Sequence, residues 1–264
     1  MKHEWQIFLT ALSFYTRIPV KPTGDFQSGY LANSIRYLPV IGWLTGLFSF
    51  MVFWCSTKLF SVEIAIMFSM LASVLLTGAL HEDGLADVCD GFGGGWTREK
   101  ILIIMKDSRI GTYGVIGLVF ILALKFLALR ELVCITSFPR QFDLLILFYL
   151  LAHSLSRFSA LSMVFTHHYA GLEENKSKQM VMNTGISDLY IALVFTLLPL
   201  LLIFILTAQY KWIFILVPLT FVKLYLGRYF NKWIGGYTGD CLGAIQQITE
   251  LVNYLSLIIL WKFF

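Results

Sequence analysis

Long apolar segments, each close to the length that crosses a lipid bilayer, limit this chain to one kind of architecture. They number seven and cover residues 37–57, 62–80, 110–129, 142–165, 189–208, 212–226 and 242–264. Unpaired backbone groups are too costly inside a bilayer, so apolar segments of this length are helical. With 58% hydrophobic residues among 264, the chain is too apolar for an ordinary water-soluble domain. We therefore predict an all-α, polytopic membrane bundle of about seven transmembrane helices, folded as a single domain over residues 1–264.

The N-terminal segment is apolar only as far as Tyr15, after which Arg17 and Pro19 interrupt it. It is too short to cross a bilayer by itself. The sequence predicts a short interfacial or re-entrant helix here, and a cleaved signal peptide is the alternative.

Lysines and arginines are divided unevenly between the two sets of loops that seven spans create. The first set carries twelve, which are Lys2, Arg17, Lys21, Arg36, Arg98, Lys100, Lys106, Arg109, Lys176, Lys178, Arg228 and Lys232. The second set carries five, which are Lys58, Arg130, Arg140, Lys211 and Lys262. Because basic loops stay in the cytoplasm, we predict that the first set faces the cytoplasm from the inner membrane. The net charge of +4 gives no reason to expect nucleic-acid binding.

Lys125 and Arg157 both fall inside predicted spans. Lys125 lies near one end of its span, so its side chain is expected to extend to the far interface. Arg157 lies deeper, near His153, and is expected to face the interior of the bundle, because charged groups at that depth need a polar cavity or a partner.

Acidic residues concentrate in the segment that follows the second apolar run. Six of the sixteen acids lie between positions 82 and 107. If residues 81–90 are helical, Asp83, Asp87 and Asp90 occur at i, i+4 and i+7 and project from one face. Three carboxylates there repel one another unless a hard divalent cation lies among them, and magnesium or manganese suits oxygen ligands. A solvated acidic helix face is the alternative.

Glycines and cations accompany these acids. The glycines are Gly84, Gly91, Gly93, Gly94 and Gly95, and they allow a backbone or a ligand to approach closely. Lys106 and Arg109 follow shortly downstream. Acids, glycines and cations together indicate a metal-assisted phosphoryl-transfer site.

Two later loops contain further polar residues. Glycines also surround Asp240 within residues 235–244, which suits a second site for a metal or an anionic ligand, or a turn in which Asp240 caps the last helix. The loop at 166–187, with His167, His168 and the acids and lysines of residues 173–178, is interpreted as a solvated connector.

Three separated motifs carry a resemblance to a known family. They are His81-x-Asp83-Gly-Leu-Ala-Asp87-x-x-Asp90-Gly, Ile104-Met-Lys-Asp-Ser-Arg-Ile-Gly111 and Gly235-Gly-x-Thr-Gly-Asp-x-Leu-Gly-Ala244. Shorter matches are Phe14-x-Thr-Arg-Ile-Pro-Val20, Pro39-x-x-Gly42 and Ser156-Arg157. On these residues the chain resembles the cobalamin synthase family, also called adenosylcobinamide-GDP ribazoletransferase, over nearly its whole length.

The resemblance implies an integral membrane enzyme of cobalamin nucleotide-loop assembly. It would join adenosylcobinamide-GDP to α-ribazole, or to its 5′-phosphate, and release GMP. One or two Mg²⁺ ions are implied as cofactor, with Mn²⁺ as a substitute. The lipid bilayer, a second copy of the chain and other enzymes of the pathway are the expected partners.

Roles for individual residues follow from this chemistry. Asp83, Asp87 and Asp90 are predicted metal ligands, and Asp107 either completes the metal site or removes the proton of the attacking hydroxyl. Lys106 and Arg109 would neutralise phosphate oxygens. The remaining predicted residues are His81 as a second base, Asp240 as a further catalytic residue, and Gly84, Gly91, Arg157 and Thr238 as substrate-binding residues.

One departure and two alternatives accompany this interpretation. The family usually has Glu where this chain has Gln247, which leaves Glu250 as the nearby acid. A CDP-alcohol phosphotransferase also releases a nucleoside monophosphate, but its signature has Arg at the position of Asp87. A cation-coupled transporter would hold its ions near the bilayer midplane between broken helices, whereas these acids were expected in a loop and its flanks.

Overall fold

The computed structural model describes residues 2–20, 28–171 and 184–263, and within them the regular structure is helical apart from one isolated bridge between Tyr169 and Tyr237. The α-helices are α1 (Lys2–Tyr15), α2 (Ser28–Ser34), α3 (Leu38–Ser56), α4 (Val62–Thr77), α5 (Leu80–Gly94), α6 (Arg98–Ile104), α7 (Thr112–Ile135), α8 (Phe142–Val164), α10 (Ile186–Thr207), α11 (Leu216–Ile234) and α12 (Gly239–Phe263). Two 3-10 helices are η1 (Ile35–Tyr37) and η2 (Tyr210–Ile215). The prediction of an all-α protein is confirmed.

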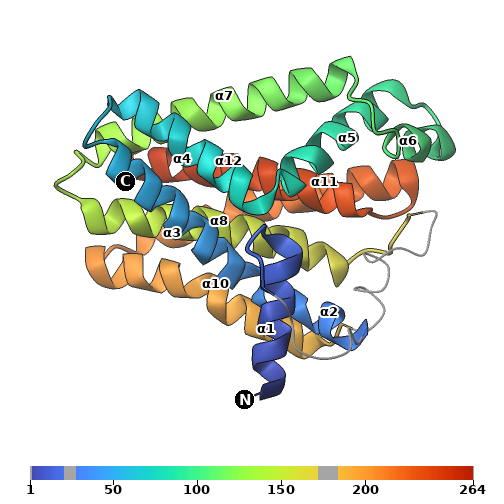
Figure 1. Cartoon of the computed structure of the whole chain (residues 1–264), viewed down its shortest axis with the longest axis horizontal. Helices are drawn as coiled ribbons and strands as arrows, with labels where there is room; N and C mark the ends of the chain where they lie inside the picture. Colours follow the sequence, from blue (N-terminus) through green and yellow to red (C-terminus); the bar gives the residue numbers. More distant parts are fainter. Residues whose placement is uncertain (1, 21–27, 172–183, 264) are drawn as a thin grey trace.

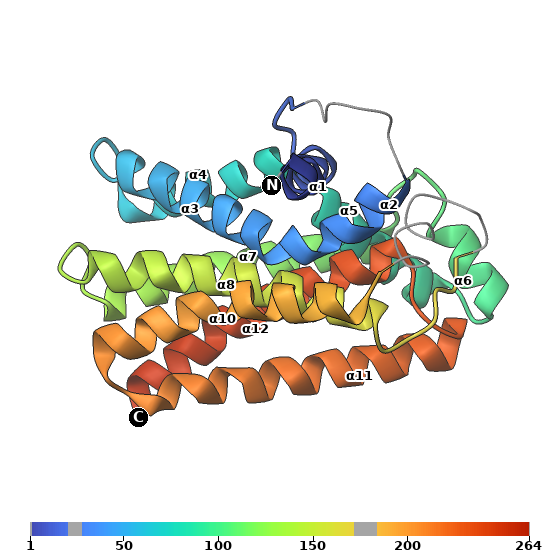
Figure 2. The same cartoon turned by 90° about the horizontal axis from the view of Figure 1, so that it is seen from below.

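Most of the long helices run roughly along one direction, side by side (Figures 1 and 2). Five stretches are long and apolar enough to cross a membrane, namely Tyr30–Ser56, Phe142–Val164, Ile186–Thr207, Tyr210–Ile234 and Gly239–Phe263. The bent pair α4 and α5 makes a sixth if it is taken as one span. Helix α7 covers the predicted third span and has 24 residues. The polytopic bundle is confirmed, but the count of seven is not.

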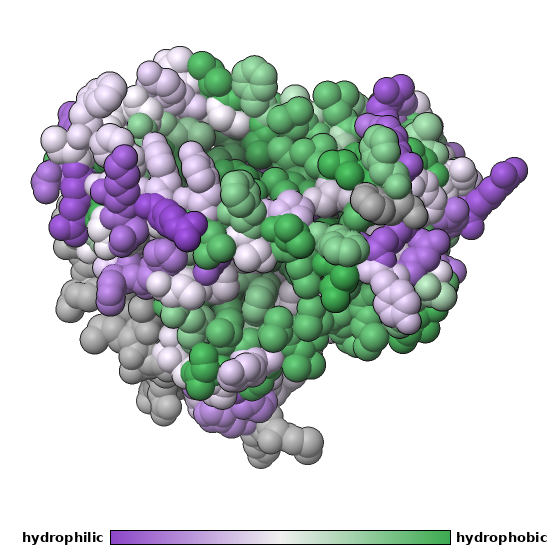
Figure 3. Space-filling view, turned by 180° about the vertical axis from the view of Figure 1, so that it is seen from behind, coloured by the Kyte–Doolittle hydropathy of each residue, from purple (hydrophilic) through white to green (hydrophobic). Residues whose placement is uncertain are grey.

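The outer surface of the bundle carries the apolar side chains that a lipid environment requires. Large exposed hydrophobic residues include Leu75 on α4, Phe120 on α7, Val194 on α10 and Phe221 on α11. In Figure 3 apolar side chains cover the middle of one face, and hydrophilic ones gather toward its two edges. This distribution matches an apolar band between two polar interfaces.

The described connections between the long helices lie at the two ends of the bundle. They divide between the ends in the same way as the two sets of loops that the sequence predicts. Helix α6 and the turn between α11 and α12 lie at one end, which we call the α6 end (Figure 2). The α3–α4 and α7–α8 connections and the C-terminus lie at the other. Lys21 and the charged residues of 173–178 lie outside the described residues.

Helix α1 runs across the long helices rather than along them (Figure 1). It has 14 residues and packs mainly against α2. At 1.5 Å per residue it is about 21 Å long, which is too short to cross a bilayer. This length agrees with the predicted short interfacial or re-entrant helix.

The predicted second span is interrupted by a sharp bend, which corrects our interpretation of residues 62–109. Gly78 and Ala79 both have left-handed backbone angles, with φ of 67° and 58°, and α5 leaves α4 at 89°. Two such residues in succession cannot continue a right-handed helix. A Cβ at Gly78 would overlap the Arg17 side chain, so the arginine of the N-terminal motif packs against the bend. Residues 80–94 are therefore a helix packed on α12 and α7, not the start of a loop.

Small residues allow the central helices α3 and α8 to pack closely. A Cβ on Gly42 would lie 2.5 Å from the carbonyl oxygen of His153, and one on Gly46 would lie 2.9 Å from that of Tyr149. Transmembrane helices commonly associate through such small residues. This contact fixes the height of His153 and Arg157 in the bundle.

Candidate functional site

The predicted acidic helix face exists on α5. Residues 81–90 are helical, and their three aspartates become progressively more buried along the helix. Asp83 is exposed, Asp87 is half-buried and Asp90 is buried. The three carboxylates therefore occupy different environments, although they share a face.

Asp90 is bound to the backbone at the start of α7. Its two carboxylate oxygens accept hydrogen bonds from the N–H groups of Gly111, at 2.7 Å, and Gly114, at 2.8 Å. A Cβ at either glycine would overlap this carboxylate. A negative charge at a helix N-terminus stabilises the helix, so Asp90 fastens α5 to α7. Its predicted role as a metal ligand stays a prediction.

We expect Asp90→Ala to lower the free energy of unfolding by about 1–3 kcal/mol, because two N–H groups lose their acceptor. Gly114→Ala should also destabilise the protein, since the new Cβ meets the Asp90 carboxylate. In a double-mutant cycle measured by denaturant titration, the effect of Gly114→Ala should shrink in the Asp90→Ala background. Equal effects in both backgrounds would contradict the contact, and Glu99→Ala on exposed α6 is the neutral control.

The first turn of α12 packs directly on the acidic helix. A Cβ at Gly84 would lie 2.9 Å from the backbone oxygen of Asp240, and one at Gly243 would lie 3.1 Å from the oxygen of His81. Asp240 consequently repels Asp83 and Asp87 electrostatically across this contact. Three carboxylates from two distant segments meet at the α6 end of the bundle.

Thr238, not Asp240, caps α12. The hydroxyl of Thr238 accepts a hydrogen bond from the backbone N–H of Cys241 at 3.3 Å and donates one to Asp240 at 3.3 Å. Asp240 follows inside the first turn, where a carboxylate also favours the helix dipole. The alternative in which Asp240 is the N-cap is therefore wrong.

The cationic motif lies on the connection between α6 and α7. The Asp107 carboxylate accepts three hydrogen bonds from Arg109, through its backbone N–H and two guanidinium nitrogens, at 2.8–3.1 Å. These bonds lower the pKa of Asp107 to about 2, so it stays ionised through the neutral range. The Arg109 side chain is 87% exposed, while Lys106 interacts favourably with Asp240. Of this motif, Lys106 is the residue directed to the carboxylates.

The other glycines of the segment serve helix packing. A Cβ on Gly91 would lie 2.5 Å from the Met105 side chain, and one on Gly95 would lie 2.6 Å from that of Ile101. Both partners belong to α6 or its end. The structure thus accounts for Gly91 by the packing of α6 on α5, while its predicted contact with substrate remains a prediction.

The four predicted metal ligands do not form a complete site by themselves. Within the described ranges, no three side chains of His, Cys, Asp or Glu lie close enough together to hold a metal ion. Asp107 is turned to Arg109, and Asp90 to the start of α7. Asp83, Asp87 and Asp240 are the carboxylates that remain grouped.

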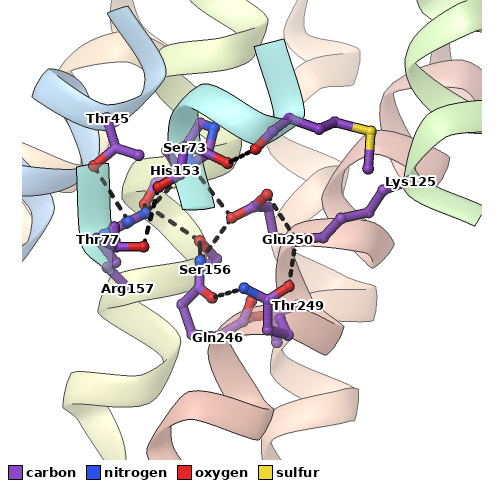
Figure 4. Close-up of polar contacts among 12 residues, drawn as sticks. Thr45, Ser73, Thr77, Lys125, His153, Ser156, Arg157, Gln246, Thr249 and Glu250 are labelled. Atoms are coloured by element: carbon purple, nitrogen blue, oxygen red, sulfur yellow. Dashed lines mark hydrogen bonds and ion pairs between the residues drawn. The ribbon is translucent and has the colours of Figure 1, made fainter. Parts of the chain in front are cut away.

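A buried ionic network lies deeper in the bundle, about 15 Å along α12 from Asp240 (Figure 4). Lys125 donates to Glu250 at 2.8 Å and to Gln247 at 2.6 Å. Glu250 also lies 3.3 Å from His153 and accepts from Gln246 at 2.6 Å. The expectation that Lys125 reaches the interface is wrong: its side chain is buried, and its charge is matched by Glu250 on α12.

Sequence analysis missed most of this network. Gln247 bridges Lys125 and Glu82, because its amide nitrogen donates to Glu82 at 2.9 Å. A glutamine can accept from a lysine and donate to a carboxylate at once, whereas glutamate in its place would meet Glu82 with like charge. The signal available beforehand was one lysine and one glutamate in otherwise apolar spans, which implies a pair.

Arg157 faces the interior, as predicted, and reaches both the network and a cavity. It is 1% exposed and donates to the His153 carbonyl at 3.0 Å and to Thr45 at 3.3 Å. The cavity has a volume of about 190 Å³ and lies among α1, α5, α8 and α12. His81, Asp83, Arg157 and Asp240 all line it. Four of the predicted site residues thus share one space.

Comparison with known proteins decides the family. A family model described as cobalamin-5-phosphate synthase matches residues 7–258. The chain belongs to the cobalamin-5-phosphate synthase family. A relative from Shewanella piezotolerans named adenosylcobinamide-GDP ribazoletransferase is 43% identical over 259 residues, covering 98% of this chain and 96% of the relative. One of the same name from Leptospira interrogans is 40% identical over 266 residues, covering 99% and 98%.

The resemblance seen in the three motifs is therefore confirmed. Membership of the cobalamin-5-phosphate synthase family favours the transferase over the CDP-alcohol phosphotransferase and transporter alternatives. One argument against transport was nevertheless wrong, because the acids do lie on the second half of a broken helix. No solved structure matches the chain.

Proposed function

We propose that this protein joins adenosylcobinamide-GDP to α-ribazole, or to its 5′-phosphate, with release of GMP and with a requirement for Mg²⁺. Family membership supports the reaction class, and the relatives carry this activity in their names. The observation that carries the proposal is the meeting of Asp83, Asp87 and Asp240 where Gly84 lets α12 approach α5.

The donor chemistry of this group suits magnesium. Mg²⁺ in phosphoryl-transfer sites keeps several waters and is held by one or two carboxylates together with substrate phosphates. Three mutually repelling carboxylates, with Lys106 acting favourably on Asp240, offer that partial set. A protein site of this kind need not contain three preassembled ligands, which agrees with the arrangement of the described residues. When bound, the ion would stabilise negative charge on the diphosphate oxygens.

Protein residues supply the remaining functions. An α-ribazole hydroxyl attacks the phosphorus that carries the cobinamide; a new P–O bond forms, the bridging P–O bond breaks and GMP leaves. Lys106 would neutralise oxygens of the diphosphate beside Asp240. Arg109, exposed on its loop, would exchange Asp107 for a phosphate, which its planar guanidinium binds in the same two-pronged way.

The attacking hydroxyl must also lose a proton. His81 lines the cavity beside Asp83, whereas Asp107 is engaged by Arg109 on the exposed loop. We therefore assign proton removal to His81 rather than Asp107. Asp107 instead holds Arg109 in position until substrate arrives.

The α6 end of the bundle is proposed to face the cytoplasm from the inner membrane, because the basic residues on α6, on the α6–α7 connection and near the end of α11 belong to the larger set. In a variant whose four native cysteines are replaced, Thr97→Cys should be shielded from an impermeant thiol reagent in intact cells. Ser137→Cys, exposed at the opposite end, should be labelled. Labelling of Thr97→Cys from outside would reverse the orientation.

The activity is tested with purified protein in liposomes. Adenosylcobinamide-GDP and α-ribazole with Mg²⁺ should yield GMP and a joined corrinoid in equal amounts, and a chelator should stop both. Release of CMP from a CDP-alcohol, or uptake of a labelled cation without GMP release, would instead support one of the alternatives. Self-association and association with other enzymes of the pathway stay predictions.

A further inference from the structure

The cavity beside the carboxylates has a distinctly apolar wall. Its lining includes Phe14, Leu38, Ala160, Leu161, Val164 and Leu242. These side chains come from α1, α3, α8 and α12, so the space closes only in the folded bundle. Asp83 and Asp240 line the same cavity. A ligand part that occupies this space would be apolar yet attached to a group that reacts at the carboxylates.

Two residues of the cavity lining have a polar atom without a hydrogen-bond partner among the described residues, Arg157 through its Nε–H and Tyr237 through its hydroxyl. The terminal nitrogens of Arg157 donate to His153 and Thr45. Glu250 and Glu82 lie near enough to offset the positive charge of Arg157. The polar part of the lining therefore suits a neutral ligand that carries an acceptor atom.

We infer that this cavity binds the base of the acceptor nucleoside, a flat, neutral, bicyclic aromatic ring with one free ring-nitrogen acceptor. The inference rests on the proposed function. An apolar cavity of roughly 150 Å³ holds benzene. The volume here, about 190 Å³, suits a benzimidazole-sized ring but excludes a corrin or a whole nucleotide.

The same lining argues against the guanine of the leaving group. Guanine carries several donors and acceptors on its edge, and most of them would be buried against leucine, alanine and valine side chains. Each buried polar group without a partner costs about 1–3 kcal/mol. A benzimidazole carries a single free ring nitrogen, so it would bury far fewer polar groups against these apolar side chains. With the base in the cavity, the ribose lies toward Asp83 and Asp240, where its hydroxyl meets the diphosphate.

Ala160 is the position that tests this assignment, because its side chain is small, buried and in the wall. Ala160→Leu projects into the cavity and should raise KM for α-ribazole at least about tenfold, the usual effect of a methylene misfit in a pocket. KM for adenosylcobinamide-GDP should stay unchanged. KM for imidazole riboside, whose base has one ring, should rise less than KM for α-ribazole does. Ala123→Leu places the same side chain on the exposed face of α7, outside the cavity, and should leave both KM values unchanged.

Each outcome decides the matter. A correctly folded Ala160→Leu protein that raises KM for adenosylcobinamide-GDP, or that leaves both KM values unchanged, would overturn the inference. If Ala160→Leu does not fold, Val164→Ala enlarges the same wall and should improve KM for an acceptor with a bulkier base; no improvement overturns the assignment. If the unmodified protein releases no GMP, the proposed function fails separately. Equilibrium dialysis of labelled α-ribazole against the unmodified and Ala160→Leu proteins then tests the cavity alone.

Discussion

Asp83→Asn and Asp240→Asn should each lower kcat by about a hundred- to a thousandfold, the effect of removing one charged group that stabilises a transition state. The carboxylates come from α5 and α12, segments separated by more than half the sequence, and Gly84 brings them together. Asparagine keeps the shape and one oxygen but removes the negative charge needed to bind Mg²⁺. The measurement is GMP release at saturating substrates in liposomes.

Controls separate this effect from damage to the fold. Glu99→Gln removes an acid from exposed α6 at the same end of the bundle and should leave kcat within about twofold, as surface substitutions generally do. Asp90→Asn should lower the free energy of unfolding more than Asp83→Asn or Asp240→Asn does, because the Asp90 oxygens accept hydrogen bonds from the start of α7. Activity above a tenth of normal in both Asp83→Asn and Asp240→Asn would remove these residues from the reaction centre.

Glu250→Leu should be the most destabilising single substitution among the buried polar residues. It leaves the Lys125 ammonium without its carboxylate in the interior of the bundle, next to His153. Removing one partner of a buried ion pair lowers the free energy of unfolding by about 3–5 kcal/mol, because the other charge stays buried. Titration of the protein in mixed micelles with a denaturing detergent measures this change.

The matched control is a second substitution in the same pair. Lys125→Met combined with Glu250→Leu replaces both charges by apolar groups, and the double variant should recover most of the lost stability. Its GMP release should also recover, since the network lies about 15 Å deeper than Asp240. A double variant no more stable than Glu250→Leu would show that Glu250 acts through His153 and Gln246 instead of Lys125.

Much of the fold was predictable because its determinants are local. Bilayer length and apolar composition identified the long helices, and a spacing of i, i+4, i+7 placed Asp83, Asp87 and Asp90 on one face of α5. Burial of Arg157 followed from its depth in an apolar span. These inferences need no knowledge of which helices are neighbours.

The features that depend on tertiary contacts were not predictable. The bend at Gly78 requires the Arg17 side chain to pack against it, and no periodicity reveals that contact. Lys125 was placed at the interface because its partner Glu250 lies far away in sequence. Asp240 was a reasonable cap for α12 by sequence, but the hydroxyl of Thr238 accepts the hydrogen bond from the first turn instead.

The proposed reaction occurs at the phosphorus that bears the cobinamide, next to Asp83 and Asp240. Adenosylcobinamide-GDP in which that phosphorus alone is radiolabelled tests this site of reaction. After turnover with α-ribazole, all of the label should appear in the joined corrinoid and none in GMP. Label in the released nucleotide would show that another bond breaks, and would contradict the reaction proposed for this site.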